Sequence, residues 1–347
     1  MRQGEAARYV SAVCRELDLR KDYLAGAPVN TLYFGGGTPS RLTAEQLGRI
    51  ISAIDSVFGL NRLEELTVEC NPDDITPDYI TALRSLGVNR ISMGVQTFND
   101  DLLTFLRRRH TAAQALNAVR TCRECGIANI SIDLMYGLPG QTLEMFRADL
   151  ETALSADVQH ISSYCLSYEE GTPLQSLRDQ GSVTPATDDL CSQMFTLMCS
   201  TLRDAGYDHY EISNFCRPGY HSRHNSSYWT GTPYLGLGAA AHSYNGTSRQ
   251  WSPSNLDTYM TAIEQAQPLF ESEHLSPTDL FNEKIMLSLR TSRGLDLSAL
   301  TPQDRSSVLQ SAQPFITRSQ LLHTGSFLRL SESALFISDS IICSLFR

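Results

Sequence analysis

The sequence has no long hydrophobic segment. No stretch approaches the roughly 18–20 apolar residues that a membrane-spanning helix requires, and the N-terminal segment MRQGEAARYV lacks the apolar core of a signal peptide. Basic residues are also in deficit, because 28 Lys and Arg stand against 38 Asp and Glu, which gives a net charge of −10. An acidic chain without a basic stretch is a poor candidate for a nucleic-acid-binding protein. We therefore expect no membrane-spanning segment and no nucleic-acid partner.

Two common phosphate-binding motifs are missing as well. Neither GxGxxG nor GxxxxGK[ST] occurs, which argues against Rossmann and P-loop chemistry. The nine cysteines are odd in number and spread over 347 residues, a pattern typical of buried thiols in a reducing compartment, so we expect a cytoplasmic location. The closely spaced pair Cys122 and Cys125 lies on a predicted helix with no second pair at zinc spacing. This spacing favours helix packing over metal binding.

What is present is a regular alternation of strand and helix patterns over the first two-thirds of the chain. Hydrophobic residues make up 41% of the sequence and charged residues 19%, which is enough apolar material for a sizeable core. We expect strands at 29–34, 66–70, 90–96, 129–135 and 158–166, and helices at 43–58, 79–86, 112–125, 143–154 and 188–205. This succession predicts an α/β fold with βαβ units and a parallel sheet, either open or closed into a barrel.

Polar residues stand where four of these strands end. They are the turn Gly35-Gly36-Gly37-Thr38, Glu69, Gln96 and Asp133. Glycines allow a close approach of backbone N–H groups to a ligand, and carboxylates bind amines or ribose hydroxyls. Each feature has an ordinary alternative: a tight turn, a helix cap for Glu69, a backbone hydrogen bond for Gln96, and a buried partner for Asp133. Because carboxyl ends of parallel strands share one face, the four together favour a binding site there.

A long connection rich in Gly, Ser, Asn, Tyr and His follows at 216–254. It contains His224, with Tyr228 and Trp229 shortly after it. Histidine is a good axial ligand for heme iron and aromatic rings pack on porphyrins, although a single loop histidine is more often an ordinary surface residue. After it, helices at 255–266 and 279–290 and a hairpin at 327–338 predict a small winged-helix-like domain. We therefore expect three parts, at 1–215, 216–254 and 255–347.

Taken together, these segments resemble one family. LYFGGGTPSRL, VECNPDDIT, RISMGVQTFND, SIDLMYGLPGQT, SSYCLSYEEGTPL, YEISNF and GLGAAAHSY occur in the order found in the radical-SAM proteins related to oxygen-independent coproporphyrinogen III oxidase. HNSSYW, at 224–229, is similar to the HNxxYW motif of the HemW branch, the heme chaperones, and LFISDSIICSLF looks like the C-terminus of that branch. The resemblance covers essentially the whole chain.

The resemblance implies a partial (β/α)6 barrel of the TIM type with a C-terminal accessory domain, and S-adenosyl-L-methionine (SAM) bound across the strand ends. The residues that match the SAM-contacting positions of the family are Gly36, Gly37, Thr38, Glu69, Gln96, Arg108, Asp133 and Ser167. Arg108 lies in FLRRRH, so either Arg107 or Arg109 is an alternative match. His224 is the residue expected to bind heme iron.

One element of the family is absent. Its members carry a CxxxCxxC loop after the first barrel strand, and the three thiolates hold a [4Fe–4S] cluster. No such spacing occurs here, and residue 1 falls just downstream of where this loop is expected. We therefore expect a barrel without its first strand and without cluster ligands. A misassigned start, a fragment and a real loss of the cluster are the three explanations, of which the first two are favoured because the SAM-matching residues are present.

Three functions follow from the resemblance. The first is a heme chaperone that binds heme and delivers it to acceptor proteins, membrane-associated or not. The second is an oxygen-independent coproporphyrinogen oxidase, and the third is an inactive truncated homologue. The HNxxYW motif favours the chaperone, which makes enzymatic activity uncertain.

Overall fold

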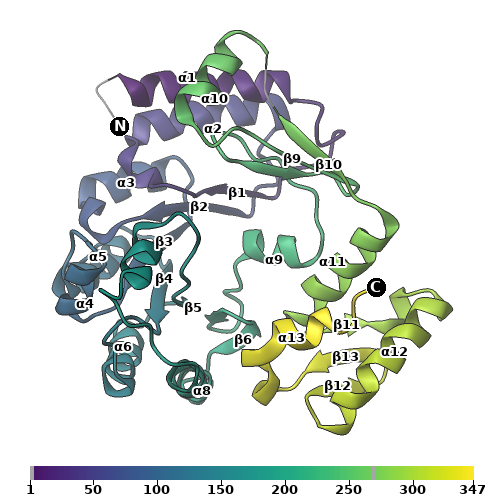
Figure 1. Cartoon of the computed structure of the whole chain (residues 1–347). Helices are drawn as coiled ribbons and strands as arrows, with labels where there is room; N and C mark the ends of the chain where they lie inside the picture. Colours follow the sequence, from purple (N-terminus) through teal and green to yellow (C-terminus); the bar gives the residue numbers. More distant parts are fainter. Residues whose placement is uncertain (1–3, 268–269) are drawn as a thin grey trace.

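The centre of the molecule is a curved sheet of seven strands (Figure 1). The computed structural model describes residues 4–267 and 270–347. The strands, in their spatial order, are β1 (Thr31–Phe34), β2 (Glu65–Cys70), β3 (Arg90–Gln96), β4 (Asn129–Tyr136), β5 (His160–Cys165), β7 (Asn214–Cys216) and β6 (Asp208–Glu211). Strands β1 to β5 are parallel, whereas β7 is antiparallel to both β5 and β6. The expected α/β partial barrel is confirmed, and β1 forms one edge of its sheet.

Helices cover the outer face of this sheet (Figure 1). They are α1 (Glu5–Leu19), α2 (Ala44–Phe58), α3 (Pro77–Ser85), α4 (Asp100–Phe105), α5 (Ala112–Glu124), α6 (Leu143–Ser155) and α8 (Asp188–Asp204). A shorter helix after β5, α7 (Pro173–Asp179), has no buried residue. Several of them begin at a capping residue, and Thr43 and Thr111 form complete capping boxes with glutamines three residues later. All five predicted parallel strands, and the helices that follow them, lie within two residues of their expected limits.

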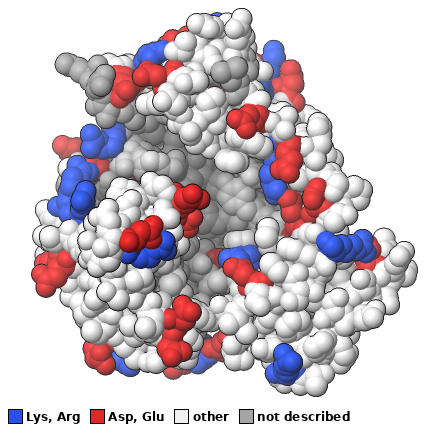
Figure 2. Space-filling view, viewed as in Figure 1, with Lys and Arg blue, Asp and Glu red and all other residues white. Residues whose placement is uncertain are grey.

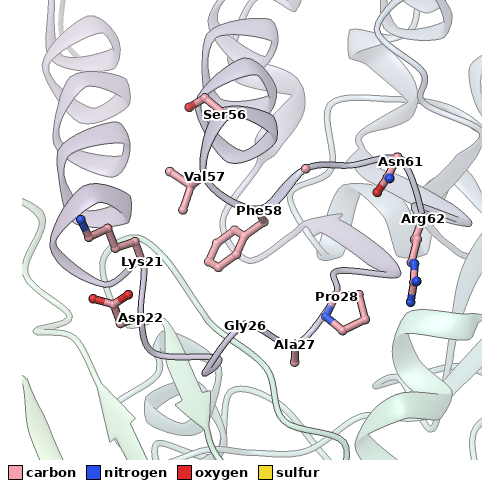
Figure 3. A pocket seen from close by; sticks show the side chains of 11 residues that line it. Lys21, Asp22, Gly26, Ala27, Pro28, Ser56, Val57, Phe58, Asn61 and Arg62 are labelled. Carbon is pink, nitrogen blue, oxygen red and sulfur yellow. The ribbon is translucent and has the colours of Figure 1, made fainter.

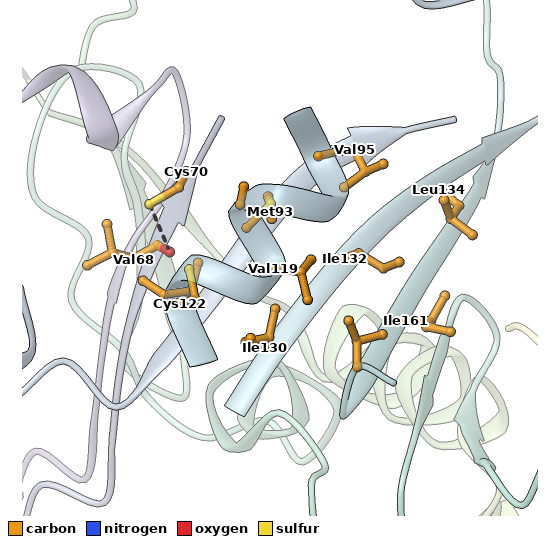
Figure 4. Packing of buried hydrophobic residues seen from close by; sticks show 14 of the residues in the cluster. Val68, Cys70, Met93, Val95, Val119, Cys122, Ile130, Ile132, Leu134 and Ile161 are labelled. Carbon is orange, nitrogen blue, oxygen red and sulfur yellow. Dashed lines mark hydrogen bonds between the residues drawn. The ribbon is translucent and has the colours of Figure 1, made fainter. Parts of the chain in front are cut away.

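The strands have one apolar and one polar face. Alternate residues point toward the helices and form the main core, together with residues of α5; those labelled in Figure 4 are Val68, Cys70, Met93, Val95, Val119, Cys122, Ile130, Ile132, Leu134 and Ile161. The residues between them face the inside of the barrel and are polar: Thr67, Glu69, Arg90, Ser92, Ser131, Asp133, His160 and Ser162. Since side chains alternate along a strand, the inner wall of the barrel is lined with hydrogen-bonding groups.

The connection after β7 carries a short helix and a second sheet. Helix α9 (Arg223–Trp229) is followed by β8 (His242–Tyr244), β9 (Ser248–Trp251), α10 (Leu256–Glu264) and β10 (Glu271–His274). The three strands form an antiparallel sheet in the order β10-β9-β8. Helix α10 packs on α1 through Ala12, Tyr259, Met260 and Ile263, and Arg8 pairs with Glu264 at 2.7 Å. This segment therefore rests on the first barrel helix.

The C-terminal part has a core of its own. It contains α11 (Pro277–Leu289), β11 (Leu295–Asp296), α12 (Pro302–Thr317), β12 (Leu321–Thr324), β13 (Phe327–Leu330) and α13 (Ser338–Cys343), with sheet order β11-β13-β12. This succession of helix, strand, helix and hairpin matches the expected winged-helix-like domain. Its apolar cluster begins at Phe281, and the division at residue 255 stays a prediction.

The hairpin predicted at 327–338 is wrong in its second half. The turn lies earlier, at Gly325 with a φ of +60°, so β13 pairs with the preceding β12. Residues Glu332–Ile337 form a 3-10 helix instead. A glycine that can adopt positive φ decided the place of the turn. No helix among the described residues is both long enough and apolar enough to cross a bilayer.

Candidate functional site

The glycine-rich turn after β1 is fastened to Glu69 at the end of β2. One Glu69 carboxylate oxygen accepts a hydrogen bond from the Tyr33 hydroxyl at 2.7 Å, and the other accepts from the backbone N–H of Gly36 at 3.1 Å. A Cβ atom at Gly35 would lie 2.3 Å from the Tyr33 ring and 2.9 Å from Glu69, so only glycine fits there. Gly36 and Gly37 are exposed, with no atom within 4 Å of an added Cβ. The space beside Gly36 and Gly37 is therefore open to a ligand.

Asp133 stands on the inner wall, on the same side as Glu69. Burial raises the pKa of Asp133 to about 6, and the Glu69 charge acts in the same direction. The Ser162 hydroxyl and the guanidinium groups of Arg90 and Arg108 oppose this rise. Burial likewise raises the pKa of Glu69 above its ordinary value. Two carboxyl groups that favour protonation form a site suited to a cationic or hydroxyl-rich ligand.

Gln96 and Arg108 approach each other above Gly94 in β3. A Cβ at Gly94 would lie 2.9 Å from the Gln96 amide nitrogen and 3.3 Å from an Arg108 guanidinium nitrogen. Arg108 donates to the Asn71 side-chain oxygen at 2.7 Å and to the Gly94 carbonyl at 2.8 Å. Gln96 has a φ of +71°, an uncommon value for a residue other than glycine.

The three consecutive arginines point in different directions. Arg107 is exposed, and Arg109 pairs on the surface with Asp73 and Asp74. Arg108 is therefore the one turned toward the inner wall. Ser167 lies two residues beyond β5 and is exposed. Its place in the site stays a prediction.

His224 lies in helix α9, and the expectation of a loop is wrong. Ser222 caps the helix by accepting from the Asn225 N–H. Glu65, which begins β2 and is 3% exposed, accepts from the backbone N–H groups of Arg223 and His224, each at 2.9 Å. The first N–H groups of a helix have no acceptor within the helix itself. The Glu65 carboxylate of the barrel supplies that acceptor and so holds the first turn of α9 in place.

Both nitrogens of the His224 ring have hydroxyl partners. Nδ1 lies 2.9 Å from the Thr31 hydroxyl of β1, and Nε2 lies 2.9 Å from the Tyr228 hydroxyl. The ring stacks on Tyr33 with centroids 4.8 Å apart. Burial lowers the pKa of His224 to about 4. The imidazole is therefore neutral near pH 7, which is the form that binds metal ions.

Tyr33 joins the two groups of predicted residues. Its hydroxyl donates to Glu69, which holds the glycine turn, and its ring stacks on His224. Two of the SAM-matching residues, Gly36 and Glu69, and the expected heme ligand thus lie around one tyrosine. Figure 2 shows this face of the molecule hollowed at its centre, between the barrel and the C-terminal part.

Comparison with known proteins identifies the family of the chain. Residues 9–153 match the Radical SAM superfamily. The heme chaperone HemW of Lactococcus lactis is 36% identical over 306 residues, covering 83% of this chain and 80% of its own. The heme chaperone HemW of Mycobacterium tuberculosis is 31% identical over 339 residues, covering 97% and 86%. The chain belongs to the HemW family of radical-SAM proteins.

A solved structure shares the fold. Coproporphyrinogen III oxidase (HemN) from Escherichia coli, a radical-SAM enzyme, superposes with a TM-score of 0.85 over 100% of this chain and 84% of HemN, at 22% identity. At this identity the likeness concerns the fold.

The radical-SAM family implies SAM and a [4Fe–4S] cluster. The residues of this HemW-family chain fit SAM but do not fit the cluster. For SAM, the inner wall brings together an exposed glycine turn, two carboxyl groups, an amide and a guanidinium. For the cluster, the CxxxCxxC motif is absent from the sequence. In the described ranges, the one group of three ligating side chains, Asp208, Cys216 and His221, contains a single thiol. These residues do not fit a three-thiolate cluster.

The two aromatic side chains of the HemW-type motif, Tyr228 and Trp229, point in different directions. Tyr228 lies edge-on to His224, with centroids 5.2 Å apart. Trp229 turns the other way, and its ring lies 5.8 Å from the guanidinium carbon of Arg290, just beyond the end of α11. Its indole nitrogen is buried with no hydrogen-bond partner among the described residues.

Three functional candidates escaped the sequence reasoning. Glu65 and Tyr33 organise α9 and the glycine turn, and Arg90 is 1% exposed with two guanidinium nitrogens that lack a described partner. The signal was present in the alternation of β2, because Glu65, Thr67 and Glu69 share one face of an otherwise apolar strand. Cys122 is buried in the core and Cys125 lies at the end of α5, as the packing interpretation expected.

The pockets described elsewhere on the surface do not bring predicted site residues together. One of about 530 Å³ lies where α1 and α2 end, lined by Lys21, Asp22, Phe58 and Arg62 among others (Figure 3). A smaller one of about 310 Å³ lies beside α6, around Asn99, Glu144 and Met145. Neither contains a predicted site residue.

Proposed function

We propose that this protein binds heme and delivers it to acceptor proteins, with the His224 imidazole as an axial ligand of the heme iron. The name of its relatives, heme chaperone, supports the proposal, and so does the HNSSYW segment. The observation that carries it is the state of His224, which is neutral, half-buried and held at Nδ1 by Thr31. A neighbour that fixes one ring nitrogen leaves the other free to bind a metal.

Binding of heme requires one local rearrangement. Nε2 faces the Tyr228 hydroxyl, and this hydroxyl has to move for the nitrogen to reach iron. Tyr228 is 37% exposed, so rotation of its side chain sacrifices little buried surface. Tyr33 and Tyr228 then provide the aromatic contacts of the porphyrin, while Trp229 stays against Arg290.

SAM is the second ligand that we propose. The residues that would hold it are Gly36, Gly37, Thr38, Glu69, Gln96, Arg108, Asp133 and Ser167. SAM supplies radical chemistry in this superfamily when it is bound beside a cluster. The residues of this chain would provide its binding surface. The exposed Gly37 of the glycine turn offers its backbone, since the Gly36 N–H is already bonded to Glu69, and Glu69 and Asp133 would accept from an amine or from ribose hydroxyls.

The partners follow from the same proposal. They are heme and heme-accepting proteins, and we place the protein in the cytoplasm. The nine cysteines are all free thiols, which supports a reducing compartment.

The test is a titration of the full chain with ferric heme, followed through the Soret band. His224→Ala should lower heme affinity at least about tenfold and shift the Soret maximum. His242→Ala is the matched control, because His242 is exposed and stacks on Trp251 in the second sheet. Unchanged affinity and spectrum in His224→Ala would contradict the assignment, and loss of binding in His242→Ala alone would move the ligand to the second sheet.

A further inference from the structure

A group of three ligating side chains lies at the β6–β7 edge of the barrel. Asp208 opens β6, Cys216 closes β7, and His221 follows in the turn before α9. One carboxylate oxygen, the thiol sulfur and one imidazole nitrogen all lie within 4.8 Å of one another. The residues belong neither to the glycine turn nor to the His224 site.

The local fold explains why they meet. Asp208 and Cys216 are directly opposite each other in the antiparallel β6–β7 pair, so their side chains emerge on the same face. The chain then turns back at Gly219, which has a φ of +86°, and the Tyr220 N–H donates to the Arg217 carbonyl at 3.0 Å. The His221 ring packs edge-on to Tyr210 of β6, with centroids 4.6 Å apart. Strand pairing, turn and ring contact together place the imidazole over the hairpin.

The donor set is chemically selective. Thiolate sulfur, imidazole nitrogen and carboxylate oxygen are the three ligand types that zinc uses, whereas calcium and magnesium prefer oxygen alone. With bond lengths of about 2.0–2.3 Å, neighbouring ligand atoms of a tetrahedral zinc lie roughly 3.3–3.6 Å apart. A small movement of the two exposed side chains, Asp208 and His221, brings the observed group to that spacing. A thiolate and a carboxylate also balance the two positive charges of the ion.

The surroundings leave room for the ion. Cys216 is fully buried at the floor of the group, whereas Asp208 and His221 are exposed at its rim, so solvent has access to a fourth position. Arg217, the basic residue next to Cys216 in the chain, is turned away, because it donates to the Ala205 carbonyl and pairs with Asp157.

We propose that Asp208, Cys216 and His221 form a zinc site with a fourth position open to water. The ion would fasten the end of β7 to the turn that leads into α9, one residue before Ser222 caps the helix. This site is independent of the heme and SAM proposals, because it shares no ligand with them.

The test uses the full chain, stripped of metal by a chelator and titrated with Co²⁺ as an optical substitute for zinc. One equivalent should bind and give a thiolate-to-cobalt charge-transfer band in the near ultraviolet, which Zn²⁺ then abolishes by displacement. Cys216→Ser should remove that band, and His221→Ala, an exposed position whose loss leaves the core intact, should weaken binding at least about tenfold. Cys343→Ser is the matched control, because Cys343 is an exposed thiol in α13.

Other outcomes would overturn the assignment. Cobalt that binds without a charge-transfer band excludes the thiol, and a band that persists in Cys216→Ser assigns it to another cysteine. Absence of stoichiometric binding to a folded chain, checked by circular dichroism, rejects the site. A titration with ferric heme in place of cobalt distinguishes a zinc site from a part of the heme site. If the chain binds no cobalt and His221→Ala lowers heme affinity, these residues belong to the heme site.

Discussion

The hydroxyl of Thr31 lies 2.9 Å from Nδ1 of His224, although 193 residues separate them in the sequence. Thr31 begins β1 at the edge of the sheet, and His224 belongs to the first turn of α9. The contact fixes which ring nitrogen points away from the barrel, so it sets the nitrogen that can bind a metal.

Thr31→Val tests this orientation. Valine keeps the shape and suits a strand, but it removes the hydrogen bond, which contributes about 1 kcal/mol. We expect heme affinity to fall about fivefold and the free energy of unfolding to fall by no more than about 1 kcal/mol, as measured by Soret titration and thermal denaturation. Thr81→Val, at an exposed position of α3, should change neither quantity. Wild-type heme affinity in Thr31→Val would mean that this contact does not position the ligand.

Glu65 should stabilise α9. Replacement by alanine leaves the N–H groups of Arg223 and His224 without their acceptor, and we expect the free energy of unfolding to fall by about 1–3 kcal/mol. Glu65→Gln keeps one acceptor oxygen and should cost less. Both variants should weaken heme binding.

The neighbouring residue provides the control for Glu65. Glu64 pairs with Arg223 on the surface, where both side chains are at least half exposed. Such pairs contribute about 0–1 kcal/mol, so Glu64→Ala should change stability little. Equal losses in the two alanine variants would contradict a specific role of Glu65 in holding the helix.

Asp133 should make stability depend on pH. Its folded pKa of about 6 lies above the ordinary value of about 3.9, so the folded chain binds the proton more tightly and the carboxylate destabilises the fold as pH rises from 4 to 6. Asp133→Asn removes that cost and should stabilise the protein by about 2–3 kcal/mol at pH 8, but hardly at pH 4. Denaturant titrations at both pH values measure the difference. Asp18→Asn, exposed on α1, should show no such trend, and a stabilisation of Asp133→Asn that is equal at both pH values would disprove the linkage.

Heme binding should persist to a lower pH than a histidine ligand with an ordinary pKa would permit. Burial lowers the pKa of His224 to about 4, below the usual value of about 6.5, and only the neutral ring binds iron. Affinity should therefore stay level from pH 7 to about pH 5 and decline only as pH approaches 4. A decline centred near pH 6.5 would show that the ligating histidine is exposed in the state that binds heme.

Substitution of Gly238 should lower stability for two reasons, a strained backbone and a steric clash, which can be tested separately. Its φ is +109°, and a Cβ there would lie 2.3 Å from the Tyr9 hydroxyl oxygen. Gly238→Ala should lower the free energy of unfolding by at least about 2 kcal/mol, and adding Tyr9→Phe should recover part of that loss, since the next ring atom is 3.4 Å away. Gly246→Ala, with a φ of +97° and open space, should show the backbone cost alone. No recovery in the double variant would assign the whole effect to the backbone.

The barrel was predictable because its signals are local. Each apolar strand run is followed by a helix with its own cap, such as Thr43 or Thr111, and the order of these elements leaves few topologies. Strands β6 and β7 escaped because they are short and antiparallel, so no helix separates them. The place of His224 in a helix escaped because the helix has seven residues, too few to show a period. Its first turn depends on Glu65, whose distance in the sequence hides the contact.

The residues of the candidate site were predictable from the sequence, but the contacts between them were not. Motif positions named Glu69, Asp133 and His224 separately. Tyr33, which contacts both Glu69 and His224, has no motif signal beyond its place in a strand. Contacts of this kind are set by the curvature of the sheet, which depends on the packing of all its helices.

The attachment of α9 at both ends has a mechanical consequence. Its first turn is bonded to Glu65 of the barrel, and Trp229, in its last turn, lies beside Arg290 at the base of the C-terminal part. Seven residues form a helix of about 10 Å, which is too short to bend. A rotation of the C-terminal part about the barrel would therefore tilt α9 as a rigid body around Glu65, and the His224 ring would slide across Tyr33.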